Sequence, residues 1–461
     1  MNNFQQKPID AKIGVKPVFS ALIHSDSQEG PCRTGTPEQL APNTERERAK
    51  ESFNRLKGDL KKVLSEDAEI LEPTYIEYGE DFAIPDNELK KLETDLENVD
   101  LFLLSYRVPG IEEYNKPVAM VGKGVSNVDV AAYLRSRGFE GYAPLDFEEL
   151  NSLISLLRVR KAIKQTKLLA ISNEELITWG VVSSVWNLED LKKRYGMKSK
   201  RVPFKTFYDA MDIVNKKAAE SLADKLIKNA DEVHMTSDNI VNSVIPYMAA
   251  KALMEKHDCN IFTIPCFELC VTKIPAKRKF TPCLTHALLK SEGYPSACEG
   301  DLSVLLGMVF LMYLSKKAAY MGNPSVEDKD ENILHIQHDM PSLKLEGLNE
   351  PDVPYQIWPF TQGGWGAAIR YDFSRDKGRE VTLARSDPSA TKLLAAKGEI
   401  VKGGRLDGGG CSLSVSIKVH DVVDLVHKQA DFGHHLAMVY GDYIQQLEEL
   451  SKIMGFEVVL A

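Results

Sequence analysis

The chain has 461 residues, a formal net charge of -9 and a pI near 5.7. A chain of this length exceeds what one hydrophobic core usually organises, so we expect two or three domains. The acidic balance argues against binding to nucleic acid or to an anionic membrane, because both attract basic surfaces. The N-terminal sequence MNNFQQKPIDAK lacks an apolar core and a small-residue cleavage site. We therefore expect no signal peptide and a cytoplasmic protein.

Residues 1–165 alternate short apolar runs with amphipathic segments, which is typical of a doubly wound α/β domain. A polar loop, 24–36, follows the first apolar run, at the edge where parallel sheets hold ligands. Arg33 in this loop could meet an acidic substituent, although a surface role is the simpler interpretation. The predicted strands are 13–23, 101–106 and 117–121, and the predicted helices are 45–64 and 127–137.

A second α/β domain is predicted over residues 166–340, with strands at 168–171, 232–235 and 261–264 and a helix at 240–256. Leu302–Leu314 contains no charged residue, and this run is too short to span a membrane. It therefore predicts a buried helix. Gly293 and Pro295 interrupt the preceding helical pattern, so we expect Glu299 and Asp301 in the first turn of this helix.

From residue 341 to 461 the sequence changes to short strand-like runs separated by Gly and Pro, which predicts a small antiparallel β-barrel. The glycines at 403–404 and 408–410 are expected in tight turns, with a ligand-contacting loop as the alternative. Helical periodicity returns near the end, where 436–454 predicts an amphipathic terminal helix that begins at His434 and His435. The predicted strands are 355–360, 367–371, 380–384, 392–401 and 411–419.

Several conspicuous residues have simple structural explanations. The seven cysteines fit reduced thiols better than a disulfide framework, and Cys266 and Cys270 have no second pair at zinc-ribbon spacing. Trp358 and Trp365 could stack on the face of a ligand, but packing is the more frequent role of tryptophan. Five further histidines are isolated in the sequence and are expected at surface or core positions: His234, His257, His286, His420 and His427.

The residues with the strongest chemical potential come from four separate predicted elements: Glu299, Asn323, His338 and His435. Strand alternation over 333–338 places His335 and His338 on opposite faces, so these two are not expected to bind one ion together. Each candidate alone has an ordinary explanation, as a helix-start carboxylate, a turn residue before proline, or a strand or helix histidine. Sequence spacing does not show that they converge.

An ordered series of blocks changes this interpretation. CEGDLSVLLGM, YMGNP, HIQHDMPS, REVTLARS, KLLAAKGEIV and FGHHLAMVYGDY follow one another from Ser291 to the C-terminus. Together they resemble the C-terminal half of the L-fucose and L-arabinose isomerase superfamily. The N-terminal half shares only its α/β character, which is common to many families.

The resemblance implies an α/β protein of two tandem Rossmann-like domains (1–165 and 166–340) followed by an antiparallel barrel with a terminal helix (341–461). It also implies a homo-trimer or homo-hexamer, a small-molecule sugar substrate and a divalent metal, manganese. By position, Glu299 resembles the metal-binding and catalytic glutamate. His338 resembles a histidine found in arabinose isomerases, and His435, or its neighbour His434, resembles the C-terminal ligand.

One position departs from the family pattern. The second catalytic carboxylate of the family falls within YMGNP, where this chain has Gly322 and Asn323. An amide oxygen can bind a metal, but the amide does not accept a proton as a general base. The metal-ligand set implied by position is therefore Glu299, Asn323, His338 and His435.

The resulting hypothesis is a metal-dependent isomerase that interconverts an aldose and a ketose through an enediol. Glu299 would bind the metal and act as base, with Asp301 in reserve, and His338 would be a ligand or a proton donor. Three alternatives remain open: other metal-dependent chemistry on a modified sugar, a non-catalytic sugar-binding protein, and a partner whose site is completed by a neighbouring subunit.

Overall fold

The computed structural model describes residues 7–175 and 180–461. The chain divides into two compact units, a smaller one of residues 11–158 and a larger one of residues 159–461 with the N-terminal stretch up to Asp10. Helix α4 (Phe147–Lys164) contains the point of division in the sequence. None of the helices within the described residues combines the length and apolar character needed to cross a bilayer.

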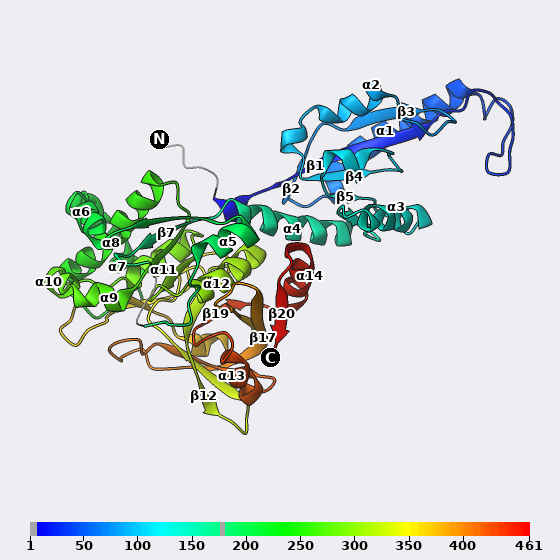
Figure 1. The fold of residues 1–461 in the computed structure, drawn as a ribbon. Coiled ribbons are helices and arrows are strands. Elements are labelled where there is room, and N and C mark those ends of the chain that lie inside the picture. Colours follow the sequence, from blue (N-terminus) through cyan, green and yellow to red (C-terminus); the bar gives the residue numbers. More distant parts are fainter. Residues whose placement is uncertain (1–6, 176–179) are drawn as a thin grey trace. The chain divides into compact units, whose positions relative to one another are not determined.

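The smaller unit is a parallel sheet in the order β2-β1-β4-β5-β6, with β3 pairing along the second half of β1 (Figure 1). Strand β4 is buried along its whole length, because helices connect successive parallel strands and cover the faces of the sheet. The predicted strands and helices of this region are confirmed, with shifted ends. The elements are β1 (Ile13–Leu22), α1 (Pro42–Val63), β2 (Ala68–Ile70), β3 (Thr74–Tyr78), α2 (Asp86–Leu89), β4 (Leu101–Leu104), β5 (Val118–Ala119), α3 (Val125–Ser136) and β6 (Gly141–Tyr142).

The larger unit begins with a four-stranded parallel sheet in the order β11-β10-β7-β8. Its carboxyl edge includes the ends of β7, β10 and β11, where polar loops can approach one another. The elements up to this point are β7 (Lys167–Ile171), α5 (Leu188–Tyr195), β8 (Lys198–Val202), α6 (Phe204–Asp212), α7 (Lys216–Asn229), α8 (Ser237–Lys256), β10 (Ile261–Ile264), α9 (Cys266–Val271), α10 (Ile274–Arg278), α11 (Cys283–Ser291) and β11 (Ser296–Cys298).

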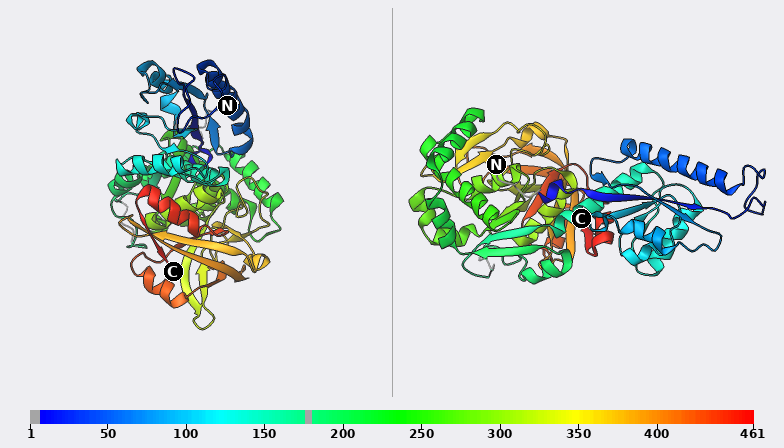
Figure 2. Two further views of the ribbon diagram at one scale, coloured as in Figure 1. Left: turned by 90° about the vertical axis from the view of Figure 1, so that its right-hand side faces the viewer. Right: turned by 90° about the horizontal axis from the view of Figure 1, so that it is seen from above.

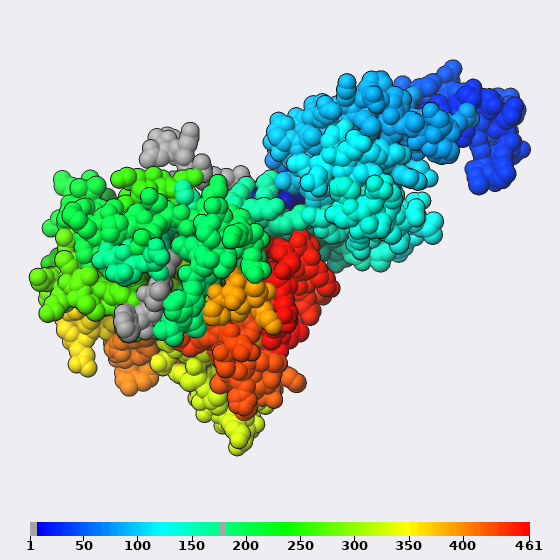
Figure 3. Space-filling view, viewed as in Figure 1, coloured from blue at the N-terminus to red at the C-terminus, as the bar shows by residue number. Residues whose placement is uncertain are grey.

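Six antiparallel strands form a closed barrel in the order β16-β19-β12-β13-β18-β17, closed by pairing of β16 with β17. Two of these strands, β12 and β13, precede residue 341, where the sequence predicted the barrel to begin. The turn between them projects from the surface of the larger unit (Figure 3). The strands are β12 (Tyr320–Asp328), β13 (Ile333–Gln337), β16 (Glu380–Ser386), β17 (Lys392–Gly403), β18 (Ser414–Val419) and β19 (Leu436–Tyr440).

Three predicted strands belong to neither the parallel sheet nor the barrel. β9 (Glu232–Val233), β14 (Gln356–Pro359) and β15 (Ala367–Arg370) form a separate three-stranded sheet, in the order β15-β14-β9. The apolar character of each run predicted a strand correctly, but it did not indicate which sheet the strand joins.

The uncharged run predicted as a core helix is helix α12 (Leu302–Ser315), and every residue from Leu302 to Tyr313 is buried. It packs against β11 on one side and against β16 and β19 on the other. This explains its uniformly apolar sequence, because the helix lies between the parallel sheet and the barrel and has no solvent-facing side.

The predicted terminal helix over 436–454 is wrong in its first part. Leu436–Tyr440 is strand β19, all five of whose residues are buried, and only Ile444–Met454 is helix α14. A short strand buried on both faces has no alternation of polar and apolar residues, so its pattern resembles that of a buried helix. Helix α13 (Val422–Gln429) precedes β19, and the final strand β20 (Glu457–Leu460) pairs in parallel with β17 outside the closed barrel (red in Figure 2).

Candidate active site with a carboxylate and two imidazoles

Glu299 lies in the loop that leaves the carboxyl end of β11. The prediction that it falls in the first turn of α12 is wrong, because the helix begins at Leu302 and Asp301 is its N-cap. Glu299 and Gly300 have φ values of +60° and +69°. This left-handed turn is rare for a glutamate and costs free energy that the surrounding structure must offset. The turn places Glu299 between the end of β11 and the start of α12.

The two histidines come from the ends of barrel strands. His338 follows β13 and His435 precedes β19, and both side chains are buried. His335 lies within β13, three residues before His338, but approaches Glu327 and Gln337 instead. The prediction that His335 and His338 do not share a site is therefore confirmed.

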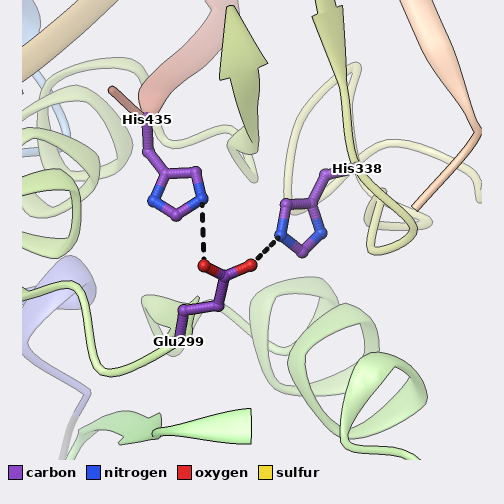
Figure 4. Close-up of side chains that lie close together, drawn as sticks. All are labelled: Glu299, His338 and His435. Carbon is purple, nitrogen blue, oxygen red and sulfur yellow. Dashed lines mark ion pairs between the residues drawn. The ribbon is translucent and has the colours of Figure 1, made fainter. Parts of the chain in front are cut away.

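Glu299 lies between the two imidazoles (Figure 4). Its Oε1 is 3.4 Å from His338 Nε2, and its Oε2 is 3.7 Å from His435 Nε2. One donor atom from each of the three residues lies within 4.8 Å of the other two. Although burial disfavours its charge, the neighbouring imidazoles keep the pKa of Glu299 below its ordinary value. The site therefore contains an ionised carboxylate.

A buried carboxylate supports the ring of His435. His435 Nδ1 donates to Asp301 Oδ2 over 2.8 Å, and Arg385 Nη1 donates to the same oxygen over 2.5 Å. Burial raises the pKa of Asp301, but Arg385 and His435 outweigh it and hold this pKa well below its usual range. Because Nδ1 carries the proton, the lone pair of His435 lies on Nε2, which faces Glu299.

The ring of His338 has different neighbours. Its Nδ1 lies 3.1 Å from the backbone nitrogen of Asp339 and 3.9 Å from Cys411 Sγ. Burial disfavours the imidazolium, but Cys411 and Glu299 together raise the pKa of His338 to about 10. At His435, in contrast, burial prevails and lowers the pKa despite Asp301. The pKa of His338 is thus raised and that of His435 is lowered, so the imidazolium form is favoured at His338 and the neutral form at His435.

The three donors fit a divalent metal ion. The Nε2 atoms of His338 and His435 are buried, and neither has a hydrogen-bond partner within residues 7–175 and 180–461. Buried polar atoms without partners are rare in proteins and call for a ligand. Carboxylate oxygen and imidazole nitrogen suit first-row divalent ions, and the ligand separations allow one ion to contact all three residues.

Asn323, the fourth predicted ligand, lies in β12 opposite Gln337 of β13. Gly322 pairs with Leu436, so continuing this register by one residue brings Asn323 beside His435. It is half-buried and carries an amide, not a carboxylate. His434 is also half-buried, and its ring is tilted by 42° relative to that of His435, with the two centroids 4.0 Å apart. Of these two neighbours, His435 belongs to the three-donor group.

Other predicted candidates lie elsewhere. The guanidinium of Arg33 is engaged by Glu45, Asp26 and the carbonyl of Leu40, so it is committed to ordering its own loop. Trp358 stacks on His234 with centroids 3.7 Å apart. All seven cysteines are free thiols.

Sequence reasoning did not identify Arg385, Cys411 or Gly180. A Cβ on Gly180 would lie 3.5 Å from Glu299 Oε2 and 2.4 Å from the ring of Phe267. Glycine at this position therefore allows the chain to pass beside the carboxylate. The available signal for Arg385 was a charged residue directly after the largely apolar run 381–384.

The fold and the site define a class of protein: an α/β protein with a closed barrel and a buried carboxylate with two imidazoles where sheet and barrel meet. No protein-family model matches the chain. Two curated proteins, the sulfoquinovose isomerases of Priestia aryabhattai and Priestia megaterium, are each 22% identical to it over 324 residues. The similarity covers 67% of this chain and 68% of each relative. At this identity the similarity supports a sugar isomerase at a general level.

Proposed function

We propose that the protein is a metal-dependent sugar isomerase that interconverts an aldose and a ketose through an enediol. The observation that carries the proposal is the ionised, buried Glu299 between two imidazole nitrogens that have no other partner. The similarity to proteins named sulfoquinovose isomerase supports the same class of reaction. The first substrate to assay is therefore sulfoquinovose, an aldose that carries a sulfonate.

In this proposal Glu299, His338 and His435 hold a divalent ion, which we propose to be manganese. When bound, such an ion polarises a carbonyl as a Lewis acid. The chain itself supplies the base. Glu299 has two oxygens that face different histidines, so one can remain a ligand while the other removes the proton from the carbon beside the carbonyl.

The return of the proton is also assigned to Glu299. Asp301 is fully buried and hydrogen-bonded to Arg385, His435 and the backbone of α12, so we do not assign it the role of reserve base. Asn323 does not accept a proton, and we assign its amide to hydrogen-bonding a sugar hydroxyl. With a single carboxylate, the proton removed from one carbon is delivered by the same group to the neighbouring carbon, and we expect part of the substrate hydrogen to be retained in the product.

The test compares metal content and activity in three variants of site residues and one control variant. Elemental analysis of purified wild-type protein should find one manganese or related ion per chain, lost in Glu299→Ala and His435→Ala. Glu299→Gln should reduce turnover of sulfoquinovose by at least about 10²-fold to 10⁴-fold, the usual contribution of a general base. His335→Ala is the matched control, because this histidine lies in β13, the strand that leads to His338, but outside the site. It should keep both the metal content and the activity of the wild type.

A non-catalytic sugar-binding protein is the second candidate, and Asn323 in place of a second acid favours it. Sugar binding without turnover by the metal-loaded protein would support this candidate. Absence of metal, with no rise in the unfolding temperature on adding manganese, would contradict the isomerase proposal. Near-native activity of Glu299→Gln would contradict it as well.

A further inference from the structure

A second buried ion pair lies beside the site, one residue beyond His338. Arg370 Nη2 is 2.6 Å from Asp339 Oδ2, and neither side chain has exposed surface. Arg370 ends β15, which lies outside the barrel, whereas Asp339 follows β13 within it. Two charges removed from water are costly unless further hydrogen bonds satisfy their remaining atoms. The groups that hydrogen-bond to the remaining atoms of Arg370 and Asp339 therefore show which part of the chain this ion pair fixes.

The pair holds the chain segment 408–413, which leads from the glycine cluster into β18. Arg370 donates to Ser412 Oγ over 2.9 Å and to the carbonyl oxygen of Gly408 over 2.8 Å. The other oxygen of Asp339, Oδ1, accepts the backbone N–H groups of Ser412 and Leu413, over 3.2 and 3.0 Å. The ion pair therefore binds oxygen atoms as well as backbone N–H groups of this segment.

The same segment holds His338. The backbone N–H of His338 donates to the carbonyl oxygen of Leu413 over 2.9 Å. Tyr320 donates its hydroxyl to the carbonyl oxygens of both residues, over 2.9 Å for His338 and 3.1 Å for Leu413. Cys411 brings its sulfur to 3.9 Å from Nδ1 of the ring. The backbone and the ring of His338 therefore both contact the segment that Arg370 fixes.

We propose that Arg370 is a positioning residue of the metal site: together with Asp339 it fixes segment 408–413, and through that segment it orients the imidazole of His338 toward Glu299. This inference rests on the proposed metal-dependent function. The side chain of Arg370 hydrogen-bonds to Asp339, Ser412 and Gly408, not to the carboxylate of Glu299 or the two imidazoles. Arg370 therefore acts on the metal site through His338. A guanidinium suits this role, because its fork reaches Asp339, Ser412 and Gly408 at once, which a lysine ammonium cannot do.

The test is manganese binding, measured by titration calorimetry on wild type, Arg370→Lys and Arg379→Lys. Arg379 is the matched control, because it bridges Glu346 and Asp376 elsewhere in the larger unit and contacts neither histidine. Arg370→Lys should bind manganese about 10-fold more weakly, the lower end of the range found when the support of a metal ligand is removed, because Arg370 acts on His338 indirectly. Arg379→Lys should bind as wild type does. Thermal unfolding establishes that each variant is folded, and Ser412→Ala, which removes a single contact of Arg370, should give a smaller loss.

A second measurement distinguishes positioning from general destabilisation. In a His338→Ala background, Arg370→Lys should cause no further loss of manganese affinity, because the residue through which it acts is gone. The visible spectrum of the cobalt-loaded protein should change in Arg370→Lys and stay unchanged in Arg379→Lys. Wild-type affinity in Arg370→Lys, or an equal loss in the His338→Ala background, would overturn the inference alone. A wild-type protein that binds no divalent ion would overturn the proposed function as well.

Discussion

The two histidines of the site face one carboxylate, but the chain supports them in different ways. His435 has a carboxylate directly on its ring, because Asp301 accepts the proton of Nδ1. His338 has a buried aspartate next to it in sequence, yet the carboxylate of Asp339 turns away to bind the backbone of residues 412 and 413. Each aspartate is paired with a buried arginine, Arg385 and Arg370 respectively.

The difference shows that similar ion pairs can serve different purposes. At His435 the pair acts electrostatically, because a carboxylate on Nδ1 leaves the lone pair on Nε2, where a metal would bind. Asp301 also accepts the first N–H groups of α12 from Ser303 and Val304, so the ring is tied to the core helix. At His338 the pair acts on the position of the backbone. We therefore expect changes near His435 to have larger effects on metal binding than changes near His338.

Of the substitutions considered, Asp301→Asn should cause the largest loss of manganese affinity and of stability. We expect the manganese affinity to fall about 10-fold to 100-fold, because His435 loses the group that sets its protonation. The free energy of unfolding should fall by about 3–5 kcal/mol, because Arg385 is left buried without a charged partner. Calorimetric titration and urea denaturation measure the two quantities.

The matched control is Asp421→Asn. Asp421 caps α13 as Asp301 caps α12, by accepting the N–H groups of Val423 and Asp424, but it is exposed and has no histidine partner in the site. It should lose little stability and no metal affinity. If Asp301→Asn lost stability but kept its metal affinity, the support of His435 would be purely structural and the comparison would fail.

The next prediction concerns Lys290, which lies near His338, and the pH dependence of the free energy of unfolding. Lys290 is fully buried and donates to the carbonyl oxygen of Met340, two residues beyond His338, over 2.6 Å. Burial lowers the pKa of Lys290 to about 7, against a small opposing effect of Cys298. Between pH 7 and the ordinary lysine pKa, the unfolded chain binds a proton that the folded chain does not. The contribution of Lys290 to stability therefore rises with pH, by about 1.4 kcal/mol per unit.

Replacing Lys290 by Met should remove this slope. The difference in free energy of unfolding between wild type and Lys290→Met, measured in urea at pH 7, 8 and 9, should shift in favour of the wild type as the pH rises. The exposed Lys205, as Lys205→Met, should give a constant difference. A constant difference for Lys290→Met as well would show that its amine stays charged in the folded protein and has further partners.

The sequence predicted those parts of the fold that depend on local pattern. The uncharged run 302–314 predicted helix α12, and the short apolar runs predicted β1, β4, β5, β7 and β10, half of the strands in the two parallel sheets. Convergence of Glu299, His338 and His435 was not visible from spacing, because they follow or precede strands of different sheets. Only the order of the motif blocks, through resemblance, indicated that these three residues belong together.

The remaining features depend on tertiary contacts that leave no local pattern. The positive φ of Glu299 is imposed by the turn between β11 and α12, and glutamate has no intrinsic preference for it. The pairing of Arg385 with Asp301 joins residues 84 positions apart, and that of Arg370 with Asp339 joins residues 31 positions apart. A charged residue at the end of an apolar strand indicates a buried partner, but it does not identify that partner.

The smallest expected effect lies at Cys411, whose sulfur is the side-chain atom near Nδ1 of His338. We expect Cys411→Ser to change manganese affinity by less than about threefold, because a thiol is a weak hydrogen-bonding group and the backbone of His338 is already fixed by Leu413. The exposed Cys270, as Cys270→Ser, is the control, and titration calorimetry is the measurement. A loss above about tenfold would mean that the thiol supports His338 as Asp301 supports His435. Both histidines would then be held by side chains on their rings, and Arg370 would act mainly by placing Cys411.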